Sequence, residues 1–235
     1  MRTLGIVGGI GPESTIEYYR QLVVGYRERV SDDSHPHLLI DSIDVNRLLH
    51  LAATPRRQGL VEYLSESLSR LARAGADFAL LAANTPHIVF GELSAASPIP
   101  LVSIVEATCD FAKARGLKRL GLIGTGFTMQ AGFYQQVFCK QGIAIVPPDP
   151  DNQAYIHEKY VKELLNGVFL PETRKGILDI ARVLEHCEHI DGLILGGTEL
   201  PPLLRKDAGI GIPFLDTTRI HVTAALERIL SACET

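Results

Sequence analysis

Two segments of this chain carry hydrogen-bonding side chains directly after short apolar runs, at matching places in its two halves. The first, residues 82–87, contains Asn84, Thr85 and His87, which supply an amide, a hydroxyl and an imidazole. This mixture of donors and acceptors suits the ammonium and carboxylate groups of an amino acid. We therefore expect Asn84 and Thr85 to bind substrate, whereas a lone histidine such as His87 is more often a structural hydrogen-bonding partner than an acid or base.

The second segment, residues 196–201, places Thr198 and Glu199 after two glycines. A carboxylate in a loop at the end of a strand is a typical functional residue, and Glu199 can pair with an ammonium group or orient a neighbouring base. The alternative is that Glu199 only stabilises the positive end of a following helix.

A glycine-rich turn precedes each of these segments. Residues 8–15 follow the first apolar run and open a helix at Pro12, which leaves backbone N–H groups available for an anion. Their glycine spacing does not match a dinucleotide-binding loop, so we expect either a substrate carboxylate or a plain strand-to-helix turn. Residues 124–128 add the hydroxyls of Thr125 and Thr128 as substrate donors, although Thr128 can equally be a helix cap.

Two basic side chains are weaker candidates for binding a carboxylate. Lys162 lies on a predicted helix, where an exposed lysine is the simpler interpretation. Arg47 can clamp a carboxylate through two hydrogen bonds or can cap a surface helix.

Short apolar runs alternate with amphipathic segments along the chain, which indicates parallel sheets covered by helices. The predicted strands are residues 3–7, 37–43, 78–82, 101–104, 119–123, 142–146, 192–195 and 213–215. The predicted helices are residues 12–29, 56–74, 103–115, 153–166, 172–187 and 218–233.

The two halves also repeat each other, since residues 5–9 resemble residues 121–125. We predict an α/β fold of two pseudo-symmetric lobes, each a parallel sheet flanked by helices. The first lobe spans residues 1–104 and the second 105–215, and a C-terminal helix in 216–235 packs back on the first lobe. Because ligands of open parallel sheets bind beyond the carboxyl ends of the strands, we expect the active-site cleft between the lobes.

Composition favours a folded, soluble protein. The chain is 46% hydrophobic and has a formal net charge of −4, which argues against a nucleic-acid partner. No apolar run reaches membrane-spanning length, so we expect a cytoplasmic protein without a membrane partner. Four scattered cysteines, Cys109, Cys139, Cys187 and Cys233, predict reduced thiols rather than disulfides or a metal site.

Five motifs together resemble the cofactor-independent aspartate/glutamate racemase family over nearly the whole chain. They lie at residues 8–15, 83–87, 124–129, 196–201 and 212–221. The resemblance implies two α/β lobes, a homodimer, and racemisation of a small amino acid or dicarboxylate with no cofactor, neither pyridoxal phosphate nor a metal. It further implies substrate contacts from Asn84, Thr85, Thr125, Thr198 and Lys162, with Arg47 as a weaker match.

Ala83 and Gly197 stand at the two positions where this family carries its catalytic cysteines. In the family, one thiolate removes the α-proton and a thiol on the opposite face returns one, and neither alanine nor glycine can do this. Loss of a comparable catalytic unit costs about 10⁶-fold in hydrolases, so we expect ordinary two-cysteine racemisation to be negligible. Glu199 or His87 as a substitute base is one hypothesis, and a non-catalytic binding or regulatory protein is the alternative.

Overall fold

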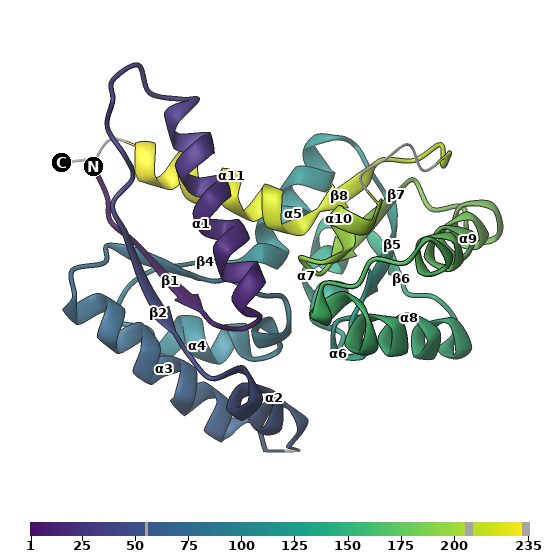
Figure 1. Cartoon of the computed structure of the whole chain (residues 1–235), viewed down its shortest axis with the longest axis horizontal. Helices are drawn as coiled ribbons and strands as arrows, with labels where there is room; N and C mark the ends of the chain where they lie inside the picture. Colours follow the sequence, from purple (N-terminus) through teal and green to yellow (C-terminus); the bar gives the residue numbers. More distant parts are fainter. Residues whose placement is uncertain (55, 205–208, 232–235) are drawn as a thin grey trace. The chain divides into compact units, whose positions relative to one another are not determined.

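The computed structural model describes residues 1–54, 56–204 and 209–231 (Figure 1). The chain forms two compact units, one made of Met1–Ala107 together with the chain from Thr218 onward, the other of Thr108–Thr217. Each unit contains a four-stranded parallel sheet flanked by helices, which confirms the predicted α/β class. None of the helices within the described ranges is long and apolar enough to cross a membrane.

The strands of the first unit are β1 (Leu4–Gly8), β2 (Leu38–Ser42), β3 (Phe78–Leu81) and β4 (Leu101–Val102). Its helices are α1 (Pro12–Arg27), α2 (Val45–Ala53), α3 (Gln58–Arg73), the 3₁₀ turn η1 (Thr85–Val89), α4 (Phe90–Ala96) and α11 (Thr217–Leu230). Helix α5 (Ile104–Ala114) begins in this unit and continues into the second.

The strands of the second unit are β5 (Arg119–Gly124), β6 (Ala144–Val146), β7 (Gly192–Gly196) and β8 (Phe214–Asp216). Its helices are α6 (Gly126–Gln130), α7 (Phe133–Phe138), η2 (Cys139–Gln141), α8 (Pro150–Lys162), η3 (Leu164–Asn166), α9 (Pro171–Glu188) and α10 (Leu200–Leu204).

The two sheets have the same strand order. It is β2-β1-β3-β4 in the first unit and β6-β5-β7-β8 in the second, with every pair parallel. The first and third strands of each unit are therefore central neighbours, and the segments that follow them emerge side by side at one edge of their sheet. This pairing brings each glycine-rich turn next to the polar segment of its own half.

Both faces of the central strands β1 and β3 are buried, which explains why these two strands are continuous apolar runs. Leu4 and Ile6 pack with residues of α1 and α11 on one face. Val7 points to the opposite face and packs with α2, α3 and α4, because successive side chains of a strand alternate. Helix α11 comes from the C-terminal end of the chain, yet it covers this N-terminal sheet.

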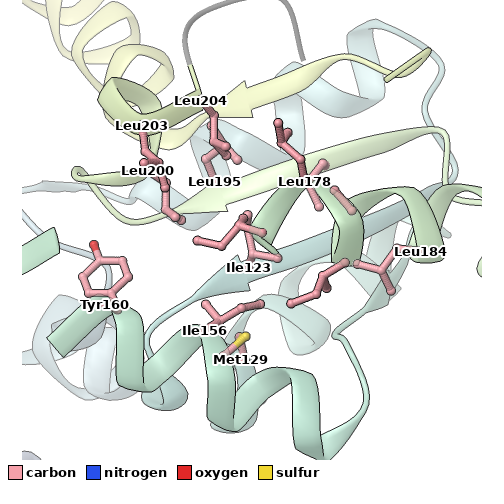
Figure 2. Packing of buried hydrophobic residues seen from close by; sticks show 14 of the residues in the cluster. Ile123, Met129, Ile156, Tyr160, Leu178, Leu184, Leu195, Leu200, Leu203 and Leu204 are labelled. Carbon is pink, nitrogen blue, oxygen red and sulfur yellow. The ribbon is translucent and has the colours of Figure 1, made fainter. Parts of the chain in front are cut away.

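One face of the second sheet packs on helices α8, α9 and α10. Ile123, Leu193 and Leu195 supply the strand side of this cluster. Figure 2 shows the cluster, with Ile156 and Tyr160 projecting from α8 toward it and Tyr160 at one end. Tyr160 is thus both a core residue and close to the edge where β7 ends.

The strand predictions are confirmed to within about two residues, and the six long helices are present. Residues 232 and 233 of the last predicted helix, and with them Cys233, lie outside the described residues. The sequence analysis did not predict α2, η1, α4, α6, α7 or α10. All six span nine residues or fewer, so they are too short to show a helical period in the sequence.

Candidate functional site

The turn after β1 and the segment after β3 form what we call the first strand-end cluster, consisting of Gly8, Gly9, Asn84 and Thr85. Val7 pairs with Leu81, and the N–H of Ala82 donates to the carbonyl of Val7 over 2.9 Å. The two segments therefore leave the sheet together at its carboxyl edge, as the parallel pairing requires.

Gly9 needs to be glycine for both conformational and steric reasons. Its φ is +78°, a region that side chains disfavour. A Cβ on Gly9 would also lie 2.7 Å from Oγ of Ser42 and 2.8 Å from the backbone N of Ile43. The N–H of Gly9 donates to Oγ1 of Thr15 over 2.8 Å, so this particular N–H already has a partner within the turn.

Asn84 and Thr85 lie where β3 gives way to the 3₁₀ turn η1. Asn84 is 5% exposed, whereas Ala83 and Thr85 are half-buried. The carbonyl of Asn84 accepts the N–H of His87 over 3.0 Å, and Pro86 lies within the first turn of η1, where a missing N–H costs nothing. The alanine at position 83 and the hydroxyl of Thr85 are thus presented at the carboxyl edge of the first sheet.

His87 is a structural hydrogen-bonding residue in this fold. The backbone N–H of Ile104 donates to its Nε2 over 3.2 Å, so the ring proton lies on Nδ1, which donates to the carbonyl of Ala83 over 3.0 Å. The ring is 3% exposed, and its burial, together with the nearby His221, lowers its pKa to about 3. Its only lone pair is engaged, which argues against the hypothesis that His87 serves as a substitute base.

His221 of α11 forms a second buried, neutral imidazole. Its Nε2 lies 3.0 Å from the carbonyl of Val102 and must donate to it, so Nδ1 accepts the hydroxyl of Tyr18 over 2.8 Å. Burial lowers the pKa of His221 to about 4. The ring centres of His87 and His221 are 6.2 Å apart, so protonation of both rings would cause unfavourable electrostatic repulsion.

Arg47 follows β2 in the first turn of α2. The helix is capped by Asp44, whose side chain accepts the N–H groups of Asn46 and Arg47. The guanidinium of Arg47 is exposed and lies 4.3 Å from the ring centre of Tyr63. Arg47 is therefore not the cap residue of this helix, and its cationic group stacks on an aromatic face while remaining accessible.

The second strand-end cluster consists of Gly124, Thr125, Gly197, Thr198 and Glu199, at the carboxyl ends of β5 and β7. Gly124 pairs with Gly196 in the sheet. The close approach depends on both glycines, because a Cβ on Gly124 would lie 2.7 Å from the carbonyl oxygen of Gly196.

Thr125, not Thr128, is the N-cap of α6, which corrects the capping alternative for Thr128. The Thr125 hydroxyl accepts the N–H of Thr128 over 3.3 Å, as expected of the residue that directly follows a strand and precedes a helix. Thr128 is 1% exposed, and its methyl group packs over Gly124 and Gly196. This placement gives Thr128 a packing role and leaves Thr125 as the more exposed hydroxyl.

Glu199 accepts two hydrogen bonds on the same carboxylate oxygen. Tyr160 of α8 donates a short bond to Oε2, and Oγ1 of Thr198 donates to it over 2.8 Å. Burial and the negative charge of Glu199 raise the pKa of Tyr160 well above its ordinary value, so the phenol keeps its proton. Tyr160 did not feature in the sequence analysis, because nothing local links it to a residue 39 positions away.

Lys162 is the last residue of α8, two positions after Tyr160. Its side chain is 71% exposed and its Nζ lies 2.8 Å from Oε1 of Glu158. Within the described part of the second unit, Lys162 thus matches the simpler interpretation of an exposed lysine with an i, i+4 ion pair.

Comparison with known proteins identifies the family. The model of the Asp/Glu/hydantoin racemase family matches residues 7–225. The chain belongs to this family. A broad-specificity amino-acid racemase of Bacillus subtilis (strain 168) is 25% identical over 221 residues, which is 92% of each chain.

Two crystal structures have the same fold over the whole chain. A candidate Asp/Glu racemase from Yersinia pestis is 31% identical with a TM-score of 0.91, covering 98% of this chain and 100% of that one. An aspartate racemase homologue from Pyrococcus horikoshii is 30% identical with a TM-score of 0.86, at the same coverage. The resemblance noted in the sequence is therefore confirmed at the level of family and fold.

Proposed function

We propose that this racemase-family chain binds a small amino acid or dicarboxylate through polar residues at the ends of its strands, and that it does not carry out two-thiol racemisation. The observation that carries the proposal is the pair Ala83 and Gly197, which lie at equivalent strand ends in two units of identical strand order. Neither residue offers an acid or a base.

Several side chains support ligand binding. Thr85 and Thr125 supply partly exposed hydroxyls, and Arg47 supplies an accessible guanidinium near the end of β2. Asn84 and Thr198 complete the polar set in their own units. Within each unit, such groups can hydrogen-bond to a carboxylate or an ammonium group without any thiol.

A second candidate is proton exchange on one face of the substrate, with Glu199 as the base. It is favoured by the Glu199 carboxylate itself, which is partly exposed and has one oxygen, Oε1, that accepts no hydrogen bond from the described residues. His87 is a poor candidate for this role because its lone pair is already engaged.

Solvent-deuterium exchange at the α-carbon separates the two candidates. Each enantiomer of aspartate and glutamate is incubated with the protein in D₂O and followed by proton NMR, while calorimetry measures binding. Saturable binding with exchange no faster than in buffer supports the binding protein. Exchange of a single enantiomer that is lost in E199Q supports the one-base enzyme, and rapid conversion between enantiomers would refute the proposal.

The cytoplasmic location and the homodimer implied by the resemblance stay predictions. Cell fractionation with an antibody tests the first. Light scattering coupled to size-exclusion chromatography tests the second, with the mass of one chain, 25.7 kDa, as the contradicting result.

A further inference from the structure

The ring of Tyr160 fills the space beside Gly197 that a side chain would need. A Cβ on Gly197 would lie 2.8 Å from Cζ and 2.9 Å from Cε2 of Tyr160. Carbon atoms pack at about 3.5–4.0 Å, so even a methyl group at position 197 would force the ring away. Gly197 and Tyr160 are thus sterically coupled, because the absence of a side chain at position 197 leaves room for the phenol of α8.

The hydroxyl of this phenol fixes the position of Glu199. Tyr160 is 3% exposed, and the cluster of apolar side chains around α8 holds its ring. Its hydroxyl and that of Thr198 both donate to Oε2 of Glu199. Two donors on one oxygen fix the orientation of the carboxylate.

The other oxygen of Glu199 is the available one. Among the described residues no donor reaches Oε1, and the side chain of Glu199 is only partly buried. A negatively charged acceptor with one oxygen held and one free is complementary to an ammonium group. It would repel a carboxylate placed at the same point.

We propose that Tyr160 takes the place of the missing side chain at position 197 and holds Glu199 as the ammonium-binding group of the second strand-end cluster. Glu199 touches the ligand, whereas Tyr160 is a positioning residue that acts through it. The inference rests on the proposed function and narrows its ligand class. The ligand is an acid with a free amino group, not a dicarboxylate without one.

Matched ligands test this inference directly. Isothermal calorimetry compares L- and D-glutamate with glutarate, and L- and D-aspartate with succinate, because each pair differs by the amino group. We expect the native protein to bind the better amino acid at least about tenfold more tightly than its deaminated analogue, the range of a hydrogen bond to a charged group. E199Q removes this preference.

Tyr160 is tested by removal of its hydroxyl alone. Y160F keeps the ring, and we expect it to reduce the preference for the amino acid by about 3- to 10-fold without weakening the binding of glutarate or succinate. Y155F is the control, since Tyr155 lies on the same helix and packs on the same cluster. A purely structural role would change the affinity for both ligands equally.

Stability measurements test the Gly197–Tyr160 pair without any ligand. G197A is expected to lower the melting temperature, and the cost is expected to be smaller in the Y160L background, where the ring is absent. If G197A lowered the melting temperature equally in the two backgrounds, the claim that the Tyr160 ring occupies the space beside Gly197 would be overturned. Equal affinity for amino acids and their analogues would overturn the ammonium site alone. Failure of every probe to bind would overturn the ammonium site and the proposed function together.

Discussion

The backbone N–H of Ile104 donates to Nε2 of His87, and this single bond determines the tautomer of a buried imidazole. The proton is left on Nδ1, where the carbonyl of Ala83 accepts it. His87 thereby connects the start of α5 to the end of β3, next to Ala83. Its neighbour His221 is held in the opposite tautomer by Tyr18 and Val102.

The two buried imidazoles predict that the protein loses stability in mild acid. In the folded state the pKa of His87 is lowered to about 3 and that of His221 to about 4, from an ordinary value of 6.5. Below pH 6.5 the two imidazoles therefore bind protons in the unfolded chain, whereas in the folded chain they stay neutral until the pH approaches their lowered pKa values. The unfolding free energy should fall between pH 6.5 and 4, by up to about 1.4 kcal/mol per pH unit for each group.

Urea unfolding at several pH values measures this effect. The unfolding free energy is plotted against pH for the native chain and for H87N, or for H221N if H87N is too unstable. The difference between the two slopes gives the contribution of one imidazole, because both proteins have the same carboxylates. The exposed His186 provides the control variant H186N. Identical slopes in the native chain and in both buried-site variants would contradict the prediction.

The structural role of His87 also predicts what its replacement does to function. H87N should lower the unfolding free energy by about 1–3 kcal/mol, because it disturbs buried hydrogen-bonding groups. The same variant, assayed below its melting temperature, should keep the native affinity for amino acids and any native rate of α-proton exchange. A folded H87N protein that binds normally but has lost all exchange would instead make His87 the base.

The turn after β1 predicts a difference between two glycines of similar backbone conformation. Gly132 has φ +76° with open space around it, whereas Gly9 has φ +78° and faces the backbone of Ile43. G132A should cost about 1–2 kcal/mol from backbone strain alone. G9A should cost about 1–3 kcal/mol more because the new methyl group has no room.

Denaturant unfolding of G9A and G132A side by side measures both costs. Since both residues lie in the left-handed region, the difference between the variants reports the steric part at the first strand-end cluster. If G9A and G132A lost the same unfolding free energy, the backbone of the turn would have to move to accommodate a methyl group at position 9.

The Tyr160 ring beside Gly197 predicts what is needed to place thiols at positions 83 and 197. A83C should fold normally, since position 83 already has a Cβ and is half-buried. The double variant A83C/G197C should be destabilised by the Tyr160 ring, whereas the triple variant with Y160A accommodates the new side chain. We expect α-proton exchange with inversion only in the triple variant.

Circular dichroism melting and deuterium exchange on all three proteins provide the measurement. The Y160A single variant is the control for loss of the ring alone. Racemisation by A83C/G197C with Tyr160 in place would mean that the ring moves aside without cost.

Much of the fold follows from local patterns in the sequence. Strands such as β1 and β7 are short apolar runs bounded by glycine, and the repeated Gly-rich turns indicate the duplication directly. The polar residues at the strand ends could be found for the same reason, because parallel strands present their carboxyl ends at one edge. Thr125 could have been identified as the helix cap, since it directly follows β5.

The interactions that decide the roles of the site residues are not local. The bond from Tyr160 to Glu199 joins residues 39 positions apart, and the bond from Ile104 to His87 joins residues 17 positions apart. In the sequence Tyr160 is one aromatic residue on the buried side of an amphipathic helix. Only the packing of α8 against the end of β7 shows that its hydroxyl reaches a carboxylate.

The position of α11 has a consequence for how the chain is made. This helix is synthesised after the strands of both sheets, yet its apolar side chains cover the α1 face of the first sheet. That face of the first sheet stays uncovered until α11 is made, directly after β8 of the second unit. The first unit therefore cannot complete its core until the strands of the second unit have been synthesised, and a chaperone that recognises exposed apolar strands would act on β1 and β3.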